Sequence, residues 1–177
     1  MTATLLDDVR RNFGARFIAA LKHSALPDEA LLHLTGPARV LKARLPVKSA
    51  SSTATYDAWR LNFVPVFGPT KGGVRFHPGV DEKSLTTLAG RILLKCAVNA
   101  LPHGGAAGGV AVAAGDLTPL ELEILARQYV AAFDAIIGED RDILSPDLGT
   151  DARVMAWMAD EIRVRRGRWE NAAVNGK

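Results

Sequence analysis

The stretch Ser84-Leu-Thr-Thr-Leu-Ala-Gly-Arg-Ile-Leu-Leu-Lys-Cys-Ala-Val98 gives the clearest structural signal in the sequence. Its apolar residues recur at the i, i+3, i+4, i+7 spacing of a single helical face: Leu85, Leu88, Ala89, Ile92, Leu93, Cys96 and Ala97. The spacing predicts an amphipathic helix over 84–98, with Cys96 in the core. Lys95 falls about 80° from Leu85, taking about 100° per residue, so it lies at the border of the apolar face and can reach an adjoining cleft.

Upstream of this helix, the sequence predicts two helices and then two strands. We place them at residues 3–24, Glu29–Leu34, Arg39–Leu45 and Thr53–Val66. A turn is expected at Ser49–Ser52, and the composition of Gly68–Gly73 is typical of a loop.

Downstream, the glycine-rich segment His103–Gly109 is also expected to be a loop. Thr118-Pro-Leu-Glu121 has the form of a capping box with proline at the first helical position, which predicts a helix to about Ile137. A short buried strand is expected at Ile143-Leu144, and Leu148-Gly-Thr150 opens a final helix. The apolar stripe of that helix comprises Val154, Met155, Met158 and Ile162. The fold class is therefore α/β, with a mixed β-sheet flanked by helices.

Composition narrows the class of protein. The chain has 177 residues, of which 48% are hydrophobic and 23% charged, as in a folded globular domain. Its formal charge of +3 is small, and no basic docking motif accompanies it, so we expect no nucleic-acid partner. The single cysteine excludes an internal disulfide and fits a reducing compartment. No apolar run reaches about 18 residues, so we expect a cytoplasmic single domain over 1–177 without a membrane partner.

Two lysines are candidates for ligand binding. Lys71 precedes Gly72-Gly73, where missing side chains let a ligand approach the backbone. Lys71 and Lys95 together could hold a dicarboxylate at two points, since each ammonium group is a compact donor for one carboxylate. From spacing alone, the alternative of two solvated lysines stays open.

Asp147 is a candidate for proton transfer, because it follows a predicted buried strand and precedes a helix. A role as a helix cap is equally compatible with the sequence. The run Gly104–Gly109 matches neither a Walker loop nor the dinucleotide fingerprint, and tight turns or close packing explain it as well. The histidines show no metal-ligand spacing, so we expect no metal site.

Several runs, in this order, resemble the N-terminal domain of glutamate dehydrogenase, in the Glu/Leu/Phe/Val dehydrogenase family. They are Gly68-Pro-Thr-Lys-Gly-Gly-Val-Arg-Phe-His-Pro78, Leu94-Lys-Cys-Ala-Val98, Leu101-Pro-His-Gly-Gly-Ala-Ala-Gly-Gly-Val110, and Gly138-Glu-Asp-Arg-Asp-Ile143 with Pro146-Asp-Leu-Gly-Thr150. Met155-Ala-Trp-Met158 continues the match, which is strongest from Phe67 to Glu161.

The resemblance implies a substrate domain that assembles into dimers or hexamers, followed in the family by a Rossmann domain that binds NAD or NADP. It implies that Lys71 binds the side-chain carboxylate of the substrate and Lys95 the α-carboxylate. It also implies that Asp147 exchanges a proton with the substrate amine. A lysine at position 71 points to the branch of the family that deaminates glutamate to 2-oxoglutarate.

Ala107 departs from the family pattern, which has the catalytic lysine in Gly-Gly-Ala-Lys-Gly-Gly. Alanine cannot exchange a proton, and no nucleotide fingerprint is present, so we expect no cofactor in this chain and no activity of the chain alone. Two hypotheses follow. The chain is the substrate and assembly domain of a glutamate-type enzyme, or it is a stand-alone, non-catalytic relative that acts as an assembly or ligand-binding module. In both, glutamate or 2-oxoglutarate is expected to bind weakly.

Overall fold

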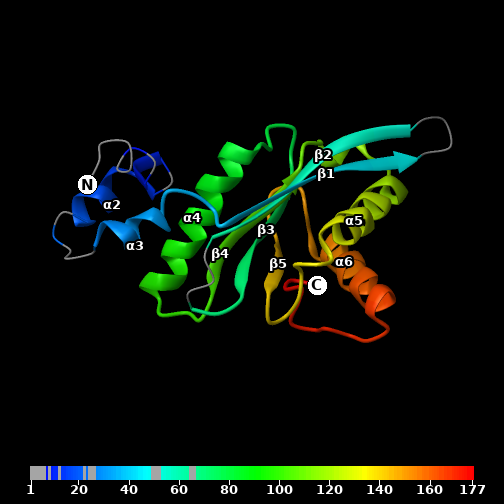
Figure 1. Cartoon of the computed structure of the whole chain (residues 1–177). Coiled ribbons are helices and arrows are strands. Elements are labelled where there is room, and N and C mark those ends of the chain that lie inside the picture. The colour runs from blue at the N-terminus through cyan, green and yellow to red at the C-terminus, as the bar shows by residue number, and fades with distance from the viewer. Residues whose placement is uncertain are drawn as a thin grey trace.

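The computed structural model describes residues 7, 9–11, 13–21, 23, 27–48, 53–63 and 67–177. Two short helices, α2 (Ala15–Leu21) and α3 (Asp28–Leu32), stand at the N-terminal end (Figure 1). The prediction of one continuous helix over 3–24 is wrong, because Gly14 has a left-handed backbone conformation (φ +89°) and interrupts it. The predicted turn at Ser49–Ser52 lies outside the described residues, as do the last residues of the strand predicted to reach Val66.

The centre of the fold is a five-stranded sheet with the order β1-β2-β4-β3-β5. Its strands are β1 (Arg39–Lys48), β2 (Thr53–Asn62), β3 (Thr70–Phe76), β4 (Gly104–Val110) and β5 (Asp142–Pro146). The pairs β1–β2 and β2–β4 are antiparallel, whereas β3 runs parallel to both β4 and β5. The predicted α/β class with a mixed sheet is confirmed.

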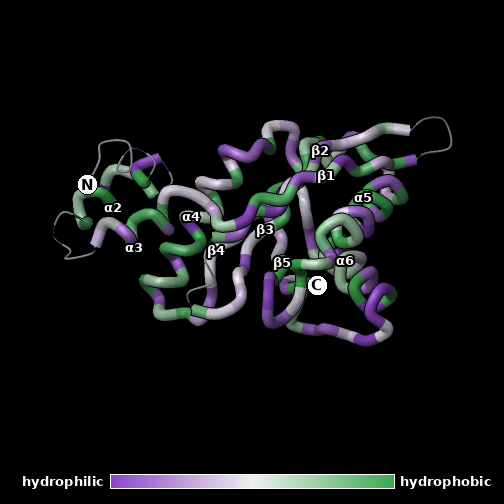
Figure 2. The backbone as a smooth tube through the Cα atoms, in the orientation of Figure 1, coloured by the Kyte–Doolittle hydropathy of each residue, from purple (hydrophilic) through white to green (hydrophobic). Residues whose placement is uncertain are grey.

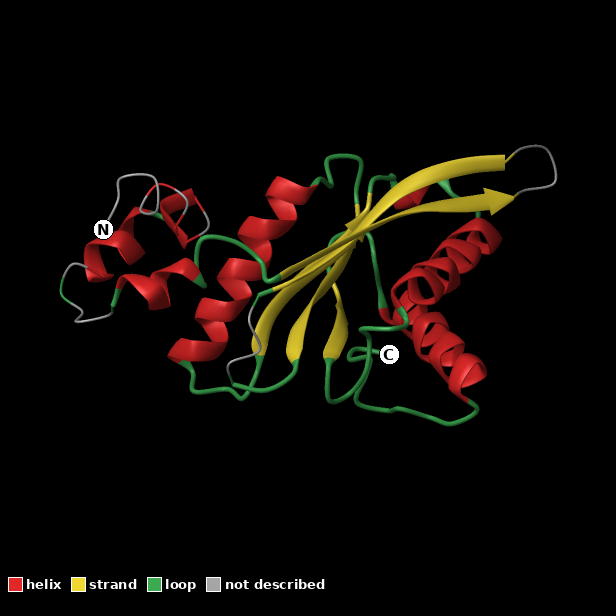
Figure 3. Ribbon diagram, in the orientation of Figure 1, coloured by secondary structure: helices red, strands yellow, loops and turns green. Residues whose placement is uncertain are grey.

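Helices cover both faces of this sheet (Figures 1 and 3). One face carries α4 (Glu82–Val98), and the opposite face carries α5 (Pro119–Phe133) and α6 (Ala152–Arg166). A single 3₁₀ turn, η1 (Ala114–Asp116), precedes α5. Figure 2 shows hydrophobic residues recurring along α4 and α5, as their amphipathic patterns predict.

The helix ends follow from capping. Thr118 and Glu121 form the predicted capping box of α5, although this helix ends at Phe133 rather than near Ile137. A second capping box, Asp81 with Ser84, starts α4 two residues before its predicted beginning. At α6 the cap is Asp151, whose carboxylate accepts a hydrogen bond from Val154 N at 2.9 Å.

Two segments that we expected to be loops are strands in the interior of the sheet. Lys71–Gly73 lies in β3, and most of His103–Gly109 forms β4. Glycine is required there because neighbouring backbones come very close. A Cβ at Gly105 would collide with the carbonyl oxygen of Ala89 in α4, and one at Gly72 with that of Ala106 in β4. The prediction of loops from composition is therefore wrong for 70–73 and 104–109, whereas Gly68, Pro69 and His103 do lie outside the strands.

A fully buried ion pair crosses the sheet on the α5 face. Arg60 of β2 donates from Nε to Asp142 Oδ2 and from Nη2 to Asp142 Oδ1, both at 2.7 Å. Burial acts to lower the pKa of Arg60, but the Asp142 carboxylate holds it above its usual value. Arg60 Nη1 also donates to the carbonyls of Gly72 and Gly73, so the guanidinium links three strands.

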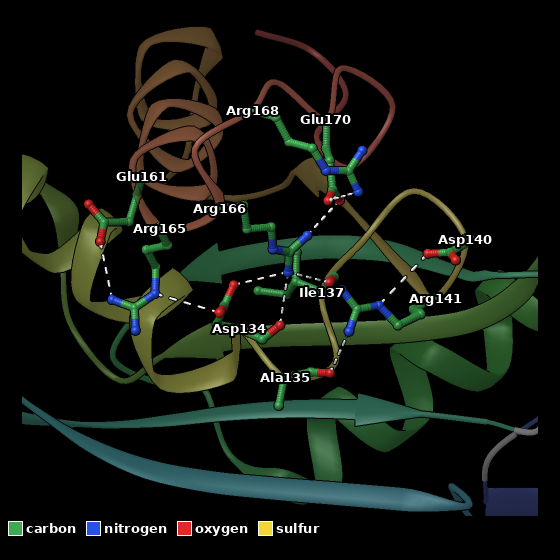
Figure 4. A network of polar contacts seen from close by, with 10 residues as sticks. All are labelled: Asp134, Ala135, Ile137, Asp140, Arg141, Glu161, Arg165, Arg166, Arg168 and Glu170. Carbon is green, nitrogen blue, oxygen red and sulfur yellow. Dashed lines mark hydrogen bonds and ion pairs between the residues drawn. The ribbon is translucent and has the colours of Figure 1, made fainter.

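The segment after α6 returns to the sheet and is held by a network of arginines and carboxylates (Figure 4). Arg166 donates to the carbonyls of Asp134 and Ile137 after α5, and also to the carboxylate of Glu170, which is buried. Beyond this network, Leu144 of β5 forms a parallel bridge with Val174. The outer edge of β5 is thus covered by the chain's own C-terminal segment.

Candidate functional site

Alternation along β3 separates two sets of side chains. Thr70, Gly72, Val74 and Phe76 are buried, whereas Lys71, Gly73 and Arg75 keep part of their surface exposed. In the parallel register, Lys71 lies beside Gly105 of β4 and Ile143 of β5. Gly73 lies beside Ser145 of β5, and Arg75 beside Gly109 of β4. Because successive side chains alternate between faces, Lys71, Gly73, Arg75, Ser145 and Asp147 share one face of the sheet.

That face is the one on which α4 lies, since a Cβ at Gly105 would point into α4. The helix packs mainly over β2 and β4, where Leu85, Ala89 and Leu93 contact Leu61 and Ala107. Beyond it, Lys71, Gly73, Arg75, Ser145 and Asp147 are only partly buried, whereas Ile143 of β5, beside Lys71, is buried. We call this surface, defined by Lys71, Gly73, Arg75, Ser145 and Asp147, the β3–β5 face.

Asp147 lies at the end of β5 with both carboxylate oxygens engaged. Arg75 donates from Nη2 to Oδ1 and from Nε to Oδ2, each at 3.2 Å. Oδ1 also accepts the backbone N–H of Leu148 at 2.8 Å. A Cβ at position 73 would fall 2.7 Å from Asp147 Cβ, so only glycine leaves room for this carboxylate. Asp151, rather than Asp147, caps α6, which removes the helix-cap alternative.

Cys96 of α4 lies near Lys71 of β3. The thiol is buried in α4, and this burial raises the pKa of Cys96, while the positive charge of Lys71 acts in the opposite direction. Lys95 is exposed in the last turn of α4, next to Cys96 in the chain. The predicted burial of Cys96 is confirmed, whereas a joint action of the two lysines on one ligand stays a prediction.

Ala107 is 3% exposed and packs under α4 with Leu61, Leu85 and Ala89. In the parallel register of β3 and β4, Thr70 pairs with Gly104 and Val74 with Gly108. The same register sets Ala107 beside Gly73, so Ala107 is adjacent to the β3–β5 face. A methyl group at this position supplies no donor, acceptor or charge to the face.

Sequence reasoning missed Arg75. The signal was present: Lys71, Gly73 and Arg75 are spaced by two, which in a strand places all three on one face. Reading Gly68–Gly73 as a loop hid this period.

The described residues were also searched for metal-ligand groups and for membrane-spanning helices. In the part of the chain that the structure describes, no group of three or more His, Cys, Asp or Glu could hold a metal ion. Among the same residues, no helix is long and apolar enough to cross a bilayer.

The fold and the β3–β5 face define an α/β domain with charged groups on a partly open face of a mixed sheet. The family model for the dimerisation domain of Glu/Leu/Phe/Val dehydrogenase matches residues 37–164, and the chain belongs to this family.

Relatives and solved structures agree with this assignment. The chain is 39% identical over 175 residues to glutamate dehydrogenase B of Halobacterium salinarum, covering 98% of this chain and 40% of that protein. It is 38% identical to the NADP-specific glutamate dehydrogenase of Synechocystis, over 92% of this chain and 38% of that protein. The hetero-hexameric glutamate dehydrogenase of Thermus thermophilus, in a leucine-bound form, superposes with a TM-score of 0.88 at 39% identity, over 98% of this chain and 40% of that one. The chain thus spans about 40% of the length of such relatives.

The family implies a nicotinamide cofactor, and the glycine-rich segment of this chain does not fit one. A pyrophosphate is bound by free backbone N–H groups in a loop that opens a helix. Here Gly104–Val110 is an interior strand, paired with β2 on one side and β3 on the other. Its amides belong to the sheet, so this segment offers no cradle for a dinucleotide.

Proposed function

We propose that residues 1–177 form the substrate-binding and oligomerisation domain of a glutamate-dehydrogenase-like oxidoreductase. In this proposal the complete enzyme deaminates glutamate to 2-oxoglutarate with NAD or NADP, and the chain assembles with further copies into dimers or hexamers. The observation that carries the proposal is the β3–β5 face, where Lys71 and Asp147 come from separate strands and share one surface over Gly73.

Each group on this face has a defined chemical task in the proposal. Lys71 binds the side-chain carboxylate of the substrate, and Lys95, at the end of α4, binds the α-carboxylate. Asp147 exchanges a proton with the substrate amine, since a carboxylate at a strand end beside a ligand surface suits general acid–base work. Gly73 lets the ligand approach the backbone of β3. Ligand binding by the isolated chain is weak, because one side of the surface stays in contact with water.

Catalysis requires more than this face supplies. We assign Ala107 to the position of the family's catalytic lysine, so this position supplies no acid–base group, and Gly104–Val110 offers no cradle for a dinucleotide. A second candidate function is therefore a non-catalytic assembly or ligand-binding module. The burial of Ala107 under α4, among apolar side chains, favours it, because the position is adapted to packing rather than to a charged group.

Ligand titration followed by NMR tests the binding proposal. Addition of 2-oxoglutarate or glutamate to the isolated chain is expected to shift amide signals along β3 and at the end of α4. Lys71→Ala should abolish these shifts, because it removes a carboxylate donor from the face. Lys83→Ala, which removes an exposed lysine at the start of the same helix, is the matched control and should leave them unchanged. Equal shifts in both variants would contradict the site.

A fusion to a compatible Rossmann domain separates the two candidate functions. With Ala107→Lys, the fusion should gain about 10²–10⁴-fold in kcat/KM for glutamate over the fusion with alanine, the contribution typical of one positioned acid–base group. The chain without the added domain should stay inactive in both forms, since it has no hydride acceptor. If the alanine and lysine fusions turn over at the same rate, position 107 is not the catalytic position.

A further inference from the structure

Ser145 occupies the middle of the β3–β5 face. In the parallel register it lies beside Gly73, one step along the face from Ile143 on one side and from Asp147 on the other. Its side chain is half-buried, and among the residues that the structure describes its hydroxyl has no hydrogen-bond partner. A hydroxyl has one donor and two acceptor positions, so it can bind a polar group of a ligand on this face.

The side chains of the face form three rows across β3 and β5. The first row holds Lys71 with Ile143, the second Gly73 with Ser145, and the third Arg75 with Asp147. Neighbouring rows are two residues apart along each strand, which corresponds to about 6.6 Å. Because Gly73 carries no side chain, Ser145 is the side chain that the middle row offers to a ligand.

The proposed function assigns the two outer rows to the ends of the ligand. Lys71 in the first row binds the side-chain carboxylate, and Asp147 in the third row meets the amino group on C2. An extended five-carbon dicarboxylate is about 5 Å long between its carboxyl carbons, since each C–C bond is about 1.5 Å. Its C3 and C4 must therefore lie between the outer rows, over Gly73 and Ser145. Glutamate and 2-oxoglutarate carry only hydrogens at these two carbons, so neither gives the hydroxyl a partner there.

The energetics of this contact favour a polar group on the ligand. A methylene group over Ser145 removes water from the hydroxyl without replacing the lost hydrogen bond, and that carries a cost. A hydroxyl group on the same carbon of the ligand restores the bond. Because Ser145 is only half-buried, water still reaches part of its surroundings, and the expected effect is a preference between ligands rather than the exclusion of one of them.

We infer that Ser145 is a specificity-determining residue that makes the β3–β5 face prefer dicarboxylates with a hydroxyl group on the carbon chain between the two ends, such as 3-hydroxy diacids and hydroxylated glutamates. The inference rests on the proposed function of the face, and it names the substrate class more closely. The ligand hydroxyl either accepts the O–H of Ser145 or donates to its Oγ. Neither bond involves Lys71 or Asp147, so the groups assigned to the ends of the ligand keep their partners.

Titration of the intact chain with 3-hydroxyglutarate and with glutarate, followed by NMR at one pH and ionic strength, tests this preference. The two diacids differ only in the hydroxyl group on the middle carbon, so the ratio of their Kd values isolates its contribution. The Kd of glutarate should exceed that of 3-hydroxyglutarate by about threefold to tenfold, the size of one net hydrogen bond. In Ser145→Ala the ratio should fall to about one, because the ligand hydroxyl loses its partner. Thr86→Ala, which removes a hydroxyl bonded within α4 to the carbonyl of Glu82, is the matched control and should leave the ratio unchanged.

Titration with 2-oxoglutarate locates the contact along the ligand. Its oxo group is on C2, at the Asp147 row, so Ser145→Ala should change the ratio of its Kd to that of glutarate by less than about twofold. A larger change would show that Ser145 contacts C2 and would overturn the inference. Equal Kd values for 3-hydroxyglutarate and glutarate in the unaltered chain, or a preference that survives Ser145→Ala, would also overturn it and leave the proposed function intact. Absence of binding for all three diacids would overturn the proposed function itself, and the inference with it.

Discussion

Two Arg–Asp pairs connect β5, or the residue directly after it, to other strands of the sheet, one on each face. On the α5 face, Arg60 and Asp142 are fully buried, and both hydrogen bonds measure 2.7 Å. On the α4 face, the side chains of Arg75 and Asp147 are 27% and 32% exposed, and their contacts measure 3.2 Å. The chemistry is the same, but the surroundings differ. A buried pair has no water to replace a lost partner, whereas a half-exposed pair can exchange one partner for another.

This difference separates a structural pair from one that is available to a ligand. Arg60 cannot leave Asp142 without leaving a charge in the core, so we expect loss of this pair to destabilise the sheet. Arg75 can leave Asp147 at small cost, since solvent screens both groups. The two pairs therefore define a comparison that substitutions can test, in stability for the first pair and in ligand binding for the second.

The largest effect is expected for Asp142→Asn. The substitution keeps the shape of the side chain but leaves the Arg60 charge buried without a counter-charge, which typically costs about 3–5 kcal/mol of unfolding free energy. Urea denaturation followed by circular dichroism measures this loss. Asp140→Asn, at a carboxylate that is 85% exposed two residues earlier, is the control and should change stability by less than about 0.5 kcal/mol. A loss below about 1 kcal/mol for Asp142→Asn would show that the buried pair does not stabilise the sheet.

Local signals in the sequence predicted the helices well. The 3.6-residue period located α4, and the capping box at Thr118 located the start of α5, because both depend on neighbouring residues. Arg60 and Asp142 are 82 positions apart in the chain, so no local sequence pattern predicts that they pair. An arginine between Trp59 and Leu61 in an apolar strand was the one available hint.

The central strands could not be predicted from composition, because glycine has the same preference for loops wherever it occurs. In β3 and β4 the glycines allow neighbouring backbones to approach closely, which only the assembled sheet reveals.

The candidate site likewise could be predicted only in part from the sequence. Motif resemblance singled out Lys71 and Asp147, and the register of β3 and β5 places them on one face. Arg75 was missed because Gly68–Gly73 was read as a loop, and its partner Asp147, 72 residues away, gave no local signal.

A smaller effect is expected for Gly108→Ala, which tests the space around the buried pair. A Cβ at this position would collide with the Tyr129 hydroxyl and lie 2.9 Å from Arg60 Cδ. Such overpacking typically costs about 1–3 kcal/mol. Gly115→Ala is the control, since no atom lies within 4 Å of its added methyl group.

Combining Gly108→Ala with Tyr129→Phe sharpens this test. Removal of the hydroxyl takes away the closest obstacle, so the double variant should lose less stability than the sum of the two single variants. Simple additivity in urea denaturation would show that the glycine is not required by the contact with Tyr129.

The smallest effect on stability is expected for Asp147→Asn, the counterpart of Asp142→Asn on the other face. Both substitutions remove the negative charge of an Arg–Asp pair from β5 or its end. Solvent screens Arg75, so unfolding free energy should change by less than about 1 kcal/mol. The same change leaves the Arg75 guanidinium without its carboxylate, and a dianion is the partner that can take its place. The Kd of 2-oxoglutarate should therefore decrease, on the order of twofold to tenfold, while stability is nearly constant. Urea denaturation and isothermal titration of the same preparation measure both quantities. A loss of stability as large as that of Asp142→Asn would mean that the half-exposed pair is structural too, and that the two faces of the sheet do not divide stability and binding between them.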